Sequence, residues 1–214
     1  MSISEIYKFK KNFRSSSYFY RFPELGIRGS HIPEDNLSFL SGIFENKKLT
    51  VLDLGAAEAG CVYLYKDKIK TYHGFEKEVR SVIAARKMFD SFNLDSRNFI
   101  IKTIKLGHQD LYKKYSDFLL KKYELVCFLG FFHKLFFTKK INSKKVKNFY
   151  KYKKNIFFIS VNVCKKYYAI HTSLKCLEAY GIFDYMEQKG FRIKYKENVD
   201  IKDRKTYCYI IWEK

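Results

Sequence analysis

The sequence predicts an α/β fold, a single domain of three layers in which helices cover both faces of a seven-stranded, mostly parallel sheet. Apolar runs of strand length alternate with helix-like stretches along the 214 residues. One of these runs stops abruptly at Gly55, as a buried strand does on entering a tight turn. The last two expected strands are separated only by the mostly polar residues 198–204, which are too few for a parallel crossover, so these strands should form an antiparallel hairpin.

Each element is placed by its pattern of apolar residues. The segment 78–92, for example, carries apolar residues at helical spacing, and Gly190 is typical of a helix stop before a strand. The expected strands lie near 50–54, 71–75, 98–104, 123–129, 155–161, 191–197 and 205–212. The expected helices lie near 34–45, 59–66, 78–92, 108–120, 133–149 and 172–189.

The turn after the first of these strands predicts a ligand site. Gly55 is followed by small residues, Ala56, Ala57 and Ala59, which keep the turn narrow enough for a ligand to approach the backbone. Asp53 places a carboxylate near the carboxyl end of the same strand, and open α/β sheets bind their ligands at that edge.

Composition excludes some classes of protein. A hydrophobic content of 47% and an aromatic content of 19% are too high for a disordered chain. No apolar run reaches the ~18 residues of a membrane span. The segment Met1–Arg14 lacks the apolar core of a signal peptide, so we expect a cytoplasmic protein. The five cysteines of the chain show no metal-binding or redox spacing and are expected to be buried, reduced thiols: Cys61, Cys127, Cys164, Cys176 and Cys208.

The net charge of +20 is compatible with a polyanionic partner. Lysine greatly exceeds arginine, however, and the chain is also rich in Ile, Asn, Phe and Tyr, whose codons are A/T-rich. The lysine excess therefore has two explanations, an A/T-rich genome or a polyanionic partner, and the sequence does not choose between them. The one local concentration is Lys134–Lys154, with nine lysines and no acid. That stretch is either a solvated helix face or a patch for RNA or another anion.

The stretch 51–60, Val-Leu-Asp-Leu-Gly-Ala-Ala-Glu-Ala-Gly, resembles the first motif of class I S-adenosylmethionine (SAM) methyltransferases, acidic-x-Gly-x-Gly-x-Gly. Gly55 is kept, Ala57 and Ala59 replace the second and third glycines, and Gly60 follows one place later. The resemblance implies a Rossmann-like sheet of order 3-2-1-4-5-7-6 and SAM as cofactor, with S-adenosylhomocysteine (SAH) as its product. It also implies that Glu76, which ends the second strand, accepts hydrogen bonds from the ribose hydroxyls.

Two later segments extend the resemblance. Gln109 or Asp110, after the third strand, stands where the family contacts the adenine amino group, although a helix cap explains them equally well. The end of the fourth strand resembles the "Leu-Gly, two apolar residues, His" form found in glycan, small-molecule and tRNA methyltransferases. There Leu129 and Gly130 would contact the cofactor, Phe131 and Phe132 the acceptor, and His133 would be the catalytic base.

The flanking segments complete the expected site. Residues 1–48 are expected to form a helical lead-in or lid before a SAM-binding domain at 49–214, with His31 on the acceptor side. His171, placed about ten residues after the expected fifth strand, is the other acceptor-side candidate. The five histidines have no close ligand spacing, so no metal is expected.

These features predict a methyltransferase acting on an oxygen or nitrogen of a small molecule or glycan. Two alternatives stay open. One is an RNA (tRNA-type) methyltransferase that uses Lys134–Lys154, and the other is a non-catalytic SAM-binding subunit, suggested by the two Gly-to-Ala departures. Neither the acceptor nor the oligomeric state follows from the sequence.

Overall fold

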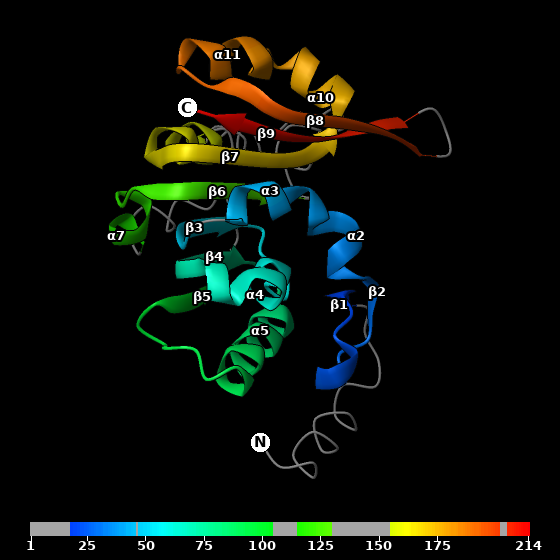
Figure 1. Cartoon of the computed structure of the whole chain (residues 1–214), viewed down its shortest axis with the longest axis vertical. Helices are drawn as coiled ribbons and strands as arrows, with labels where there is room; N and C mark the ends of the chain where they lie inside the picture. Colours follow the sequence, from blue (N-terminus) through cyan, green and yellow to red (C-terminus); the bar gives the residue numbers. More distant parts are fainter. Residues whose placement is uncertain (1–17, 46, 105–114, 130–154, 202–204) are drawn as a thin grey trace, which may run out of the picture.

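The structure, a computed structural model, describes residues 18–45, 47–104, 115–129, 155–201 and 205–214. Seven strands form one sheet in the order β5-β4-β3-β6-β7-β9-β8 (Figure 1). These strands are β3 (Leu49–Leu54), β4 (Ile69–Glu76), β5 (Phe99–Thr103), β6 (Tyr123–Leu129), β7 (Cys164–Ser173), β8 (Arg192–Ile201) and β9 (Lys205–Glu213).

The strands β3 to β7 run parallel, whereas β9 is antiparallel to both of its neighbours, β7 and β8. Counted from β3, the order is 3-2-1-4-5-7-6. The predicted strand order and the terminal antiparallel hairpin are therefore confirmed.

Helices cover both faces of the sheet. One face carries α2 (Pro33–Leu37), α3 (Ser41–Phe44), α4 (Gly60–Tyr65) and α5 (Val79–Ser91). The other face carries α7 (Ser116–Leu119), a helical segment at 155–163, α10 (Leu174–Ala179) and α11 (Ile182–Gln188). Short 3₁₀ turns complete the connections: η1 (Pro23–Leu25), η2 (Ser38–Leu40) and η3 (Lys66–Lys68).

Alternate residues of the central strands supply the two cores. In β6, Leu125 and Cys127 join the core beneath α4 and α5, while Val126 and Phe128 join the core on the opposite face. Successive side chains of a strand point to opposite faces, so a strand buried on both sides has a nearly continuous apolar sequence. The expected three-layer sandwich is confirmed.

The predicted strand at 155–161 is wrong, because this segment is helical and the fifth strand of the sheet is β7. Its buried residues are Ile156, Phe157, Ser160 and Val161, the spacing of one helix face. The hydroxyl of Ser160 contacts the hydroxyl of Tyr168 on β7 at 2.6 Å, so helix and strand pack together. A short apolar run does not distinguish a buried strand from a buried helix, and the tertiary packing decided.

The shifted fifth strand changes the predicted helices around it. The helix expected at 172–189 begins only at Leu174 and is broken at Gly181, whose φ of 58° is left-handed. The helix expected at 34–45 is likewise divided into α2, η2 and α3. Of the helix expected at 108–120, only α7 lies within the described residues, and the helix expected at 133–149 lies outside them.

The described part of the lead-in contains strands as well as short helices. β1 (Tyr18–Tyr20) and β2 (Gly29–His31) form a separate parallel pair. Leu40 and Phe44, from the helical part, pack into the core beneath β3. The division of the chain at residue 48 stays a prediction.

The cysteine prediction is confirmed, since all five cysteines are free and buried. Within the described part of the chain, no helix has the length and apolarity needed to cross a membrane. Over the same residues, no cluster of three or more His, Cys, Asp or Glu side chains is arranged to hold a metal ion. The expected absence of a metal stays a prediction.

Candidate functional site

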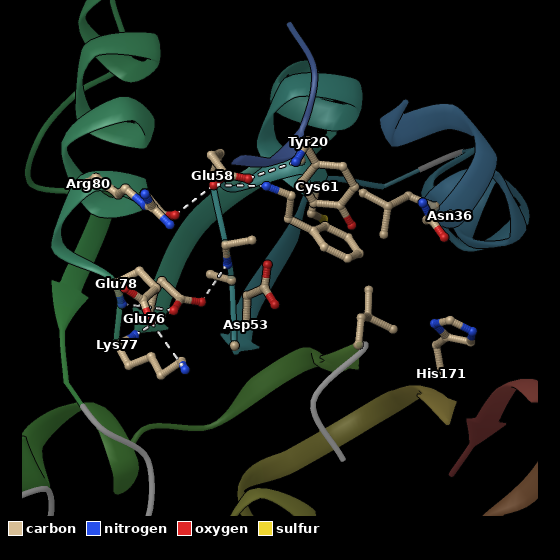
Figure 2. A pocket seen from close by; sticks show the side chains of 18 residues that line it. Tyr20, Asn36, Asp53, Glu58, Cys61, Glu76, Lys77, Glu78, Arg80 and His171 are labelled. Atoms are coloured by element: carbon tan, nitrogen blue, oxygen red, sulfur yellow. Dashed lines mark hydrogen bonds and ion pairs between the residues drawn. The ribbon is translucent and has the colours of Figure 1, made fainter. Parts of the chain in front are cut away.

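A cavity opens at the carboxyl edge of the parallel strands, where β3, β4, β6 and β7 end (Figure 2). The lead-in and the first turn of α5 form the rest of its wall. The predicted site residues that line this cavity are Asp53, Gly55, Ala57, Gly60, Glu76, Leu129 and His171. The structure thus brings the described part of the predicted cofactor site together in one cavity.

The turn after β3 keeps a left-handed path despite its alanines. Gly55 has a φ of 82°, and Ala57 and Ala59 have φ values of 48° and 58°. The backbone N–H groups of Gly55 and Ala56 donate to the carbonyl of Phe75 at 2.9 and 3.1 Å, which ties the turn to β4. A left-handed alanine costs about 1–2 kcal/mol, so these contacts hold the turn in a conformation that glycine adopts more easily.

Asp53 is a buried acid at the centre of the site. Its carboxylate accepts a hydrogen bond from the hydroxyl of Tyr72 at 2.9 Å. Burial raises the pKa of Asp53 to about 7, the Tyr72 bond opposes this shift, and the nearby Glu76 charge adds to it. Among the described residues no lysine or arginine pairs with Asp53. A cationic ligand group beside this carboxylate would relieve the cost of its burial.

Gly74 makes the contact between Tyr72 and Asp53 possible. A Cβ at Gly74 would lie 2.8 Å from Cε1 and 2.9 Å from the hydroxyl oxygen of Tyr72. Since residues two apart in a strand share a face, only glycine at this position lets the Tyr72 ring lie along β4 towards Asp53.

Glu76 is held by backbone donors. Its Oε2 accepts from the N–H of Ala57 at 2.9 Å, and its Oε1 accepts from the N–H groups of Lys77 and Glu78 at 2.7 and 3.0 Å. A carboxylate has about four acceptor positions, so the side chain is fixed in place and still has capacity for a ligand hydroxyl. The predicted position of Glu76 at the end of its strand is observed.

Gly60 has a packing role that the sequence did not indicate. A Cβ on Gly60 would lie 2.8 Å from Cε2 of Tyr20 and 3.1 Å from Cδ1 of Leu37. Gly60 therefore lets the Tyr20 ring, which is 5% exposed, pack against the start of α4 and line the cavity.

A different kind of wall lies on the side of β7. His171 stacks on Tyr209 of β9, with ring centroids 4.0 Å apart and an interplanar angle of 3°. The hydroxyl of Tyr209 donates to Oδ1 of Asn36 at 3.3 Å, and Nδ2 of Asn36 is buried without a hydrogen-bond partner. Figure 2 shows Asn36 and His171 across the cavity from Glu76 and Lys77. His171 belongs to β7 itself, and not to a segment after the fifth strand as predicted.

The remaining candidates lie elsewhere. His31 is exposed on β2, where its ring packs against the ring of Phe19 at 4.5 Å, and it does not line the cavity. Several predicted residues lie outside the described residues: Gln109, Asp110, Gly130, Phe131, Phe132 and His133, together with the whole of Lys134–Lys154. Their roles stay predictions.

Sequence reasoning missed four residues that shape the cavity, namely Tyr20, Asn36, Glu58 and Tyr72. The Tyr-x-Gly spacing of Tyr72 and Gly74 signals that a ring lies along the strand over the glycine. Asn36 and Tyr20 carry no such signal, because they reach the cavity only through tertiary contacts.

The comparison with solved structures identifies the architecture. The chain is similar to a magnesium protoporphyrin IX methyltransferase from Synechocystis PCC 6803 with bound SAM, at 12% identity over 83% of this chain and 76% of that chain, with a TM-score of 0.54. It is similar to a putative RNA methyltransferase from Pyrococcus horikoshii, at 11% identity over 100% and 98% of the two chains, with a TM-score of 0.56.

It is also similar to M. capricolum TrmK in complex with SAH, at 18% identity over 83% and 67% of the two chains, with a TM-score of 0.51. This chain has the class I methyltransferase fold. At these identities the similarity establishes the fold alone. No protein-family model and no curated protein sequence matches the chain. Within the methyltransferase fold, the cavity occupies the carboxyl edge of the sheet, where open α/β folds bind their ligands.

Proposed function

We propose that this chain is a SAM-dependent methyltransferase that methylates an oxygen or nitrogen of a small molecule or glycan. One observation carries the proposal: two acids, Asp53 and Glu76, end adjacent strands on either side of a left-handed turn and line one cavity. Solved structures of the same fold hold SAM or SAH, which supports this cofactor.

The residues present fit the two polar ends of the cofactor. Asp53 is a buried carboxylate without a cationic partner among the described residues, which suits the α-ammonium group of SAM. Glu76, fixed by Ala57, Lys77 and Glu78, suits the ribose hydroxyls because its spare lone pairs can only accept.

When bound, SAM supplies a methyl group activated by a sulfonium. The chain must then align the acceptor with that methyl and exclude water, and proximity and orientation provide much of the acceleration. Leu129 and the buried ring of Tyr20 give the cavity apolar walls that exclude water.

Asn36 and His171 are the described residues that we assign to the acceptor. Nδ2 of Asn36 is a donor without a partner, and the Tyr209 hydroxyl holds its amide in place through Oδ1. A buried hydrogen-bond donor of this kind favours a methyl-accepting substrate that presents an oxygen or nitrogen lone pair to it. The stack on Tyr209 holds the His171 ring at the same wall. Polar groups of this kind in a partly apolar cavity are typical of small-molecule sites.

The cofactor proposal is tested by isothermal titration calorimetry of the full chain with SAH. We expect one site, and Glu76→Ala should bind at least about tenfold more weakly, since each lost hydrogen bond contributes about 1 kcal/mol. If the wild type does not bind SAH, the proposed function is rejected. Unchanged affinity in the variant removes Glu76 from the site.

The acceptor class is tested with radiolabelled SAM. Label transferred to the small-molecule fraction of a cell extract supports the proposal, whereas label transferred only to RNA supports the alternative. RNA binding should be modest and should weaken steeply with salt, because lysine contacts to phosphates are electrostatic. Sequence-selective RNA binding that survives moderate salt would replace the small-molecule proposal.

His133 stays the proposed base. If it accepts a proton from the acceptor, His133→Ala should reduce turnover by about 10²-fold or more and leave SAH affinity nearly unchanged. The non-catalytic alternative was motivated by Ala57 and Ala59, yet both adopt the left-handed conformation that a glycine turn requires. SAH binding without turnover on any acceptor would favour that alternative.

A further inference from the structure

The turn at the cofactor cavity contains a buried acid, Glu58, between Ala57 and Ala59. Its side chain is 1% exposed. One oxygen, Oε2, accepts from the backbone N–H of Tyr20 at 2.9 Å, and the other, Oε1, accepts from the hydroxyl of Ser81 at 2.6 Å and from the N–H of Phe19 at 3.4 Å. Figure 2 shows this carboxylate between the turn, α5 and the lead-in.

Glu58 is an unusual residue for a purely structural position. Among the described residues no lysine or arginine pairs with it, although Arg80 lines the same cavity. Burial raises the pKa of Glu58, while the bonds from Ser81, Tyr20 and Phe19 lower it, so these three donors favour the ionised form. A carboxylate with no donors of its own accepts all three without competition.

The strand that Glu58 holds forms a wall of the cavity. β1 is 38 residues earlier in the chain, and both Phe19 and Tyr20 line the cavity. The Tyr20 ring fills the space that Gly60 leaves beside Leu37. On the other side of Glu58, the N–H of Ala57 donates to Glu76. Two consecutive residues of one turn therefore connect to the lead-in strand and to the proposed ribose acceptor.

We propose that Glu58 is a positioning residue that holds β1 over the cofactor cavity, so that Phe19 and Tyr20 close it and retain the cofactor. The inference rests on the proposed function for the identity of that cofactor. The contact between Glu58 and β1 does not depend on the proposed function, and a separate experiment below measures it. Loss of the Glu58 carboxylate should release β1 and weaken SAH binding together.

The variant Glu58→Gln keeps the size of the side chain but replaces one acceptor oxygen with an NH₂ group. That group cannot accept a hydrogen bond from the N–H and O–H donors that surround it. A matched control exists at the opposite end of β3. There the Glu124 carboxylate accepts from the N–H of Thr50 at 3.0 Å and from its hydroxyl at 3.3 Å. Glu124→Gln changes the same chemical group on a long-range backbone contact, away from the cavity.

Release of β1 is measured by limited trypsin digestion of the full chain without cofactor, with mass spectrometry of products that begin at Phe22 and Gly29. Arg21 and Arg28 are exposed, so cleavage after them reports opening of the lead-in. We expect Glu58→Gln to be cleaved there about tenfold faster than the wild type and to bind SAH about tenfold more weakly in calorimetry. Glu124→Gln should match the wild type in both measurements.

Cleavage of Glu58→Gln at the wild-type rate, equally fast cleavage of Glu124→Gln, or SAH affinity of Glu58→Gln within twofold of the wild type would each overturn the inference. A wild type that does not bind SAH instead rejects the proposed function, and the cleavage rates then judge the contact between turn and strand alone. If Glu58→Gln does not fold, the wild type is digested with and without saturating SAH. Slower cleavage with SAH supports closure by β1, and an unchanged rate overturns it.

Discussion

The two sides of the cavity are built by different means. On the cofactor side, Glu76 and Glu58 accept hydrogen bonds from backbone N–H groups, those of Ala57 and Tyr20, in addition to the side-chain bonds that Asp53 and Glu58 accept from hydroxyls. On the acceptor side, side chains bind side chains, as His171 stacks on Tyr209 and Tyr209 bonds to Asn36. A hydrogen bond donated by a backbone N–H survives most substitutions of the donating residue. A contact between two side chains changes whenever either residue is substituted.

The two sides also differ in how far apart their residues lie in the sequence. Ala57 and Glu76 are separated by 19 residues, within one strand–helix–strand unit, whereas Asn36 and Tyr209 are separated by 173. The contact between Ala57 and Glu76 therefore forms within one local unit, whereas the contact between Asn36 and Tyr209 forms only when distant segments pack together. This difference predicts that substitutions on the two walls act on separate properties of the protein.

The largest effect is expected at Glu76. Glu76→Ala removes an acceptor from three backbone donors and from the ribose hydroxyls, so SAH affinity should fall by about 100-fold, or about 2.7 kcal/mol. Calorimetry measures it. Glu78→Ala, two residues along the same wall, is the control and should change affinity less than about threefold. Equal effects of the two variants would contradict the assigned role.

The next effect is a pH dependence caused by Asp53. Its pKa is raised to about 7, above the ordinary 3.8, so the folded protein holds a proton that the unfolded chain releases, and stability falls as pH rises between these values. A ligand ammonium beside Asp53 would lower that pKa and expel the proton. SAH affinity should therefore rise by up to about tenfold per pH unit below pH 7 and level off above it.

Calorimetry at pH 6, in buffers of different ionisation enthalpy, counts the released proton. Asp53→Asn should abolish both the proton release and the pH dependence below pH 7. If wild-type affinity is the same at pH 5.5 and pH 7, the ammonium group does not lie beside Asp53.

A smaller effect is expected in the turn itself. Ala57→Gly and Ala59→Gly remove left-handed alanines, so each should stabilise the fold by about 1 kcal/mol after the greater freedom of glycine in the unfolded chain is subtracted. For a chain of this size this corresponds to about 2–4 °C in Tm. Thermal unfolding measures it, and Ala84→Gly in the middle of α5 is the control, which should lower Tm.

The smallest effect on cofactor binding is expected from the acceptor side. His171→Phe keeps an aromatic ring to stack on Tyr209 and removes both ring nitrogens. SAH affinity should change by less than about twofold, because the proposed cofactor contacts lie on the other wall. A loss as large as that of Glu76→Ala would show that the two sides are not separate.

Much of the fold was predictable because parallel strands have a distinct sequence pattern. Strands buried on both faces, such as β3 and β6, have nearly continuous apolar sequences, interrupted only by residues such as Asp53 and Glu124. The short link between β8 and β9 fixes their antiparallel pairing. The segment 155–163 was not predictable on this basis, since its buried residues fit a strand and a helix equally well.

The sequence by itself determined the positions of Asp53, Gly55 and Glu76, because a strand, a turn and a strand end are local features. The strand order was predicted through the resemblance to the methyltransferase family, and the structure confirms it. Only the tertiary structure decided that Tyr20 reaches over Gly60, that Glu58 binds a strand 38 residues earlier, and that Asn36 meets Tyr209. These contacts join segments that are distant in the sequence, and their energy depends on packing and burial in three dimensions, which local patterns of residues do not contain.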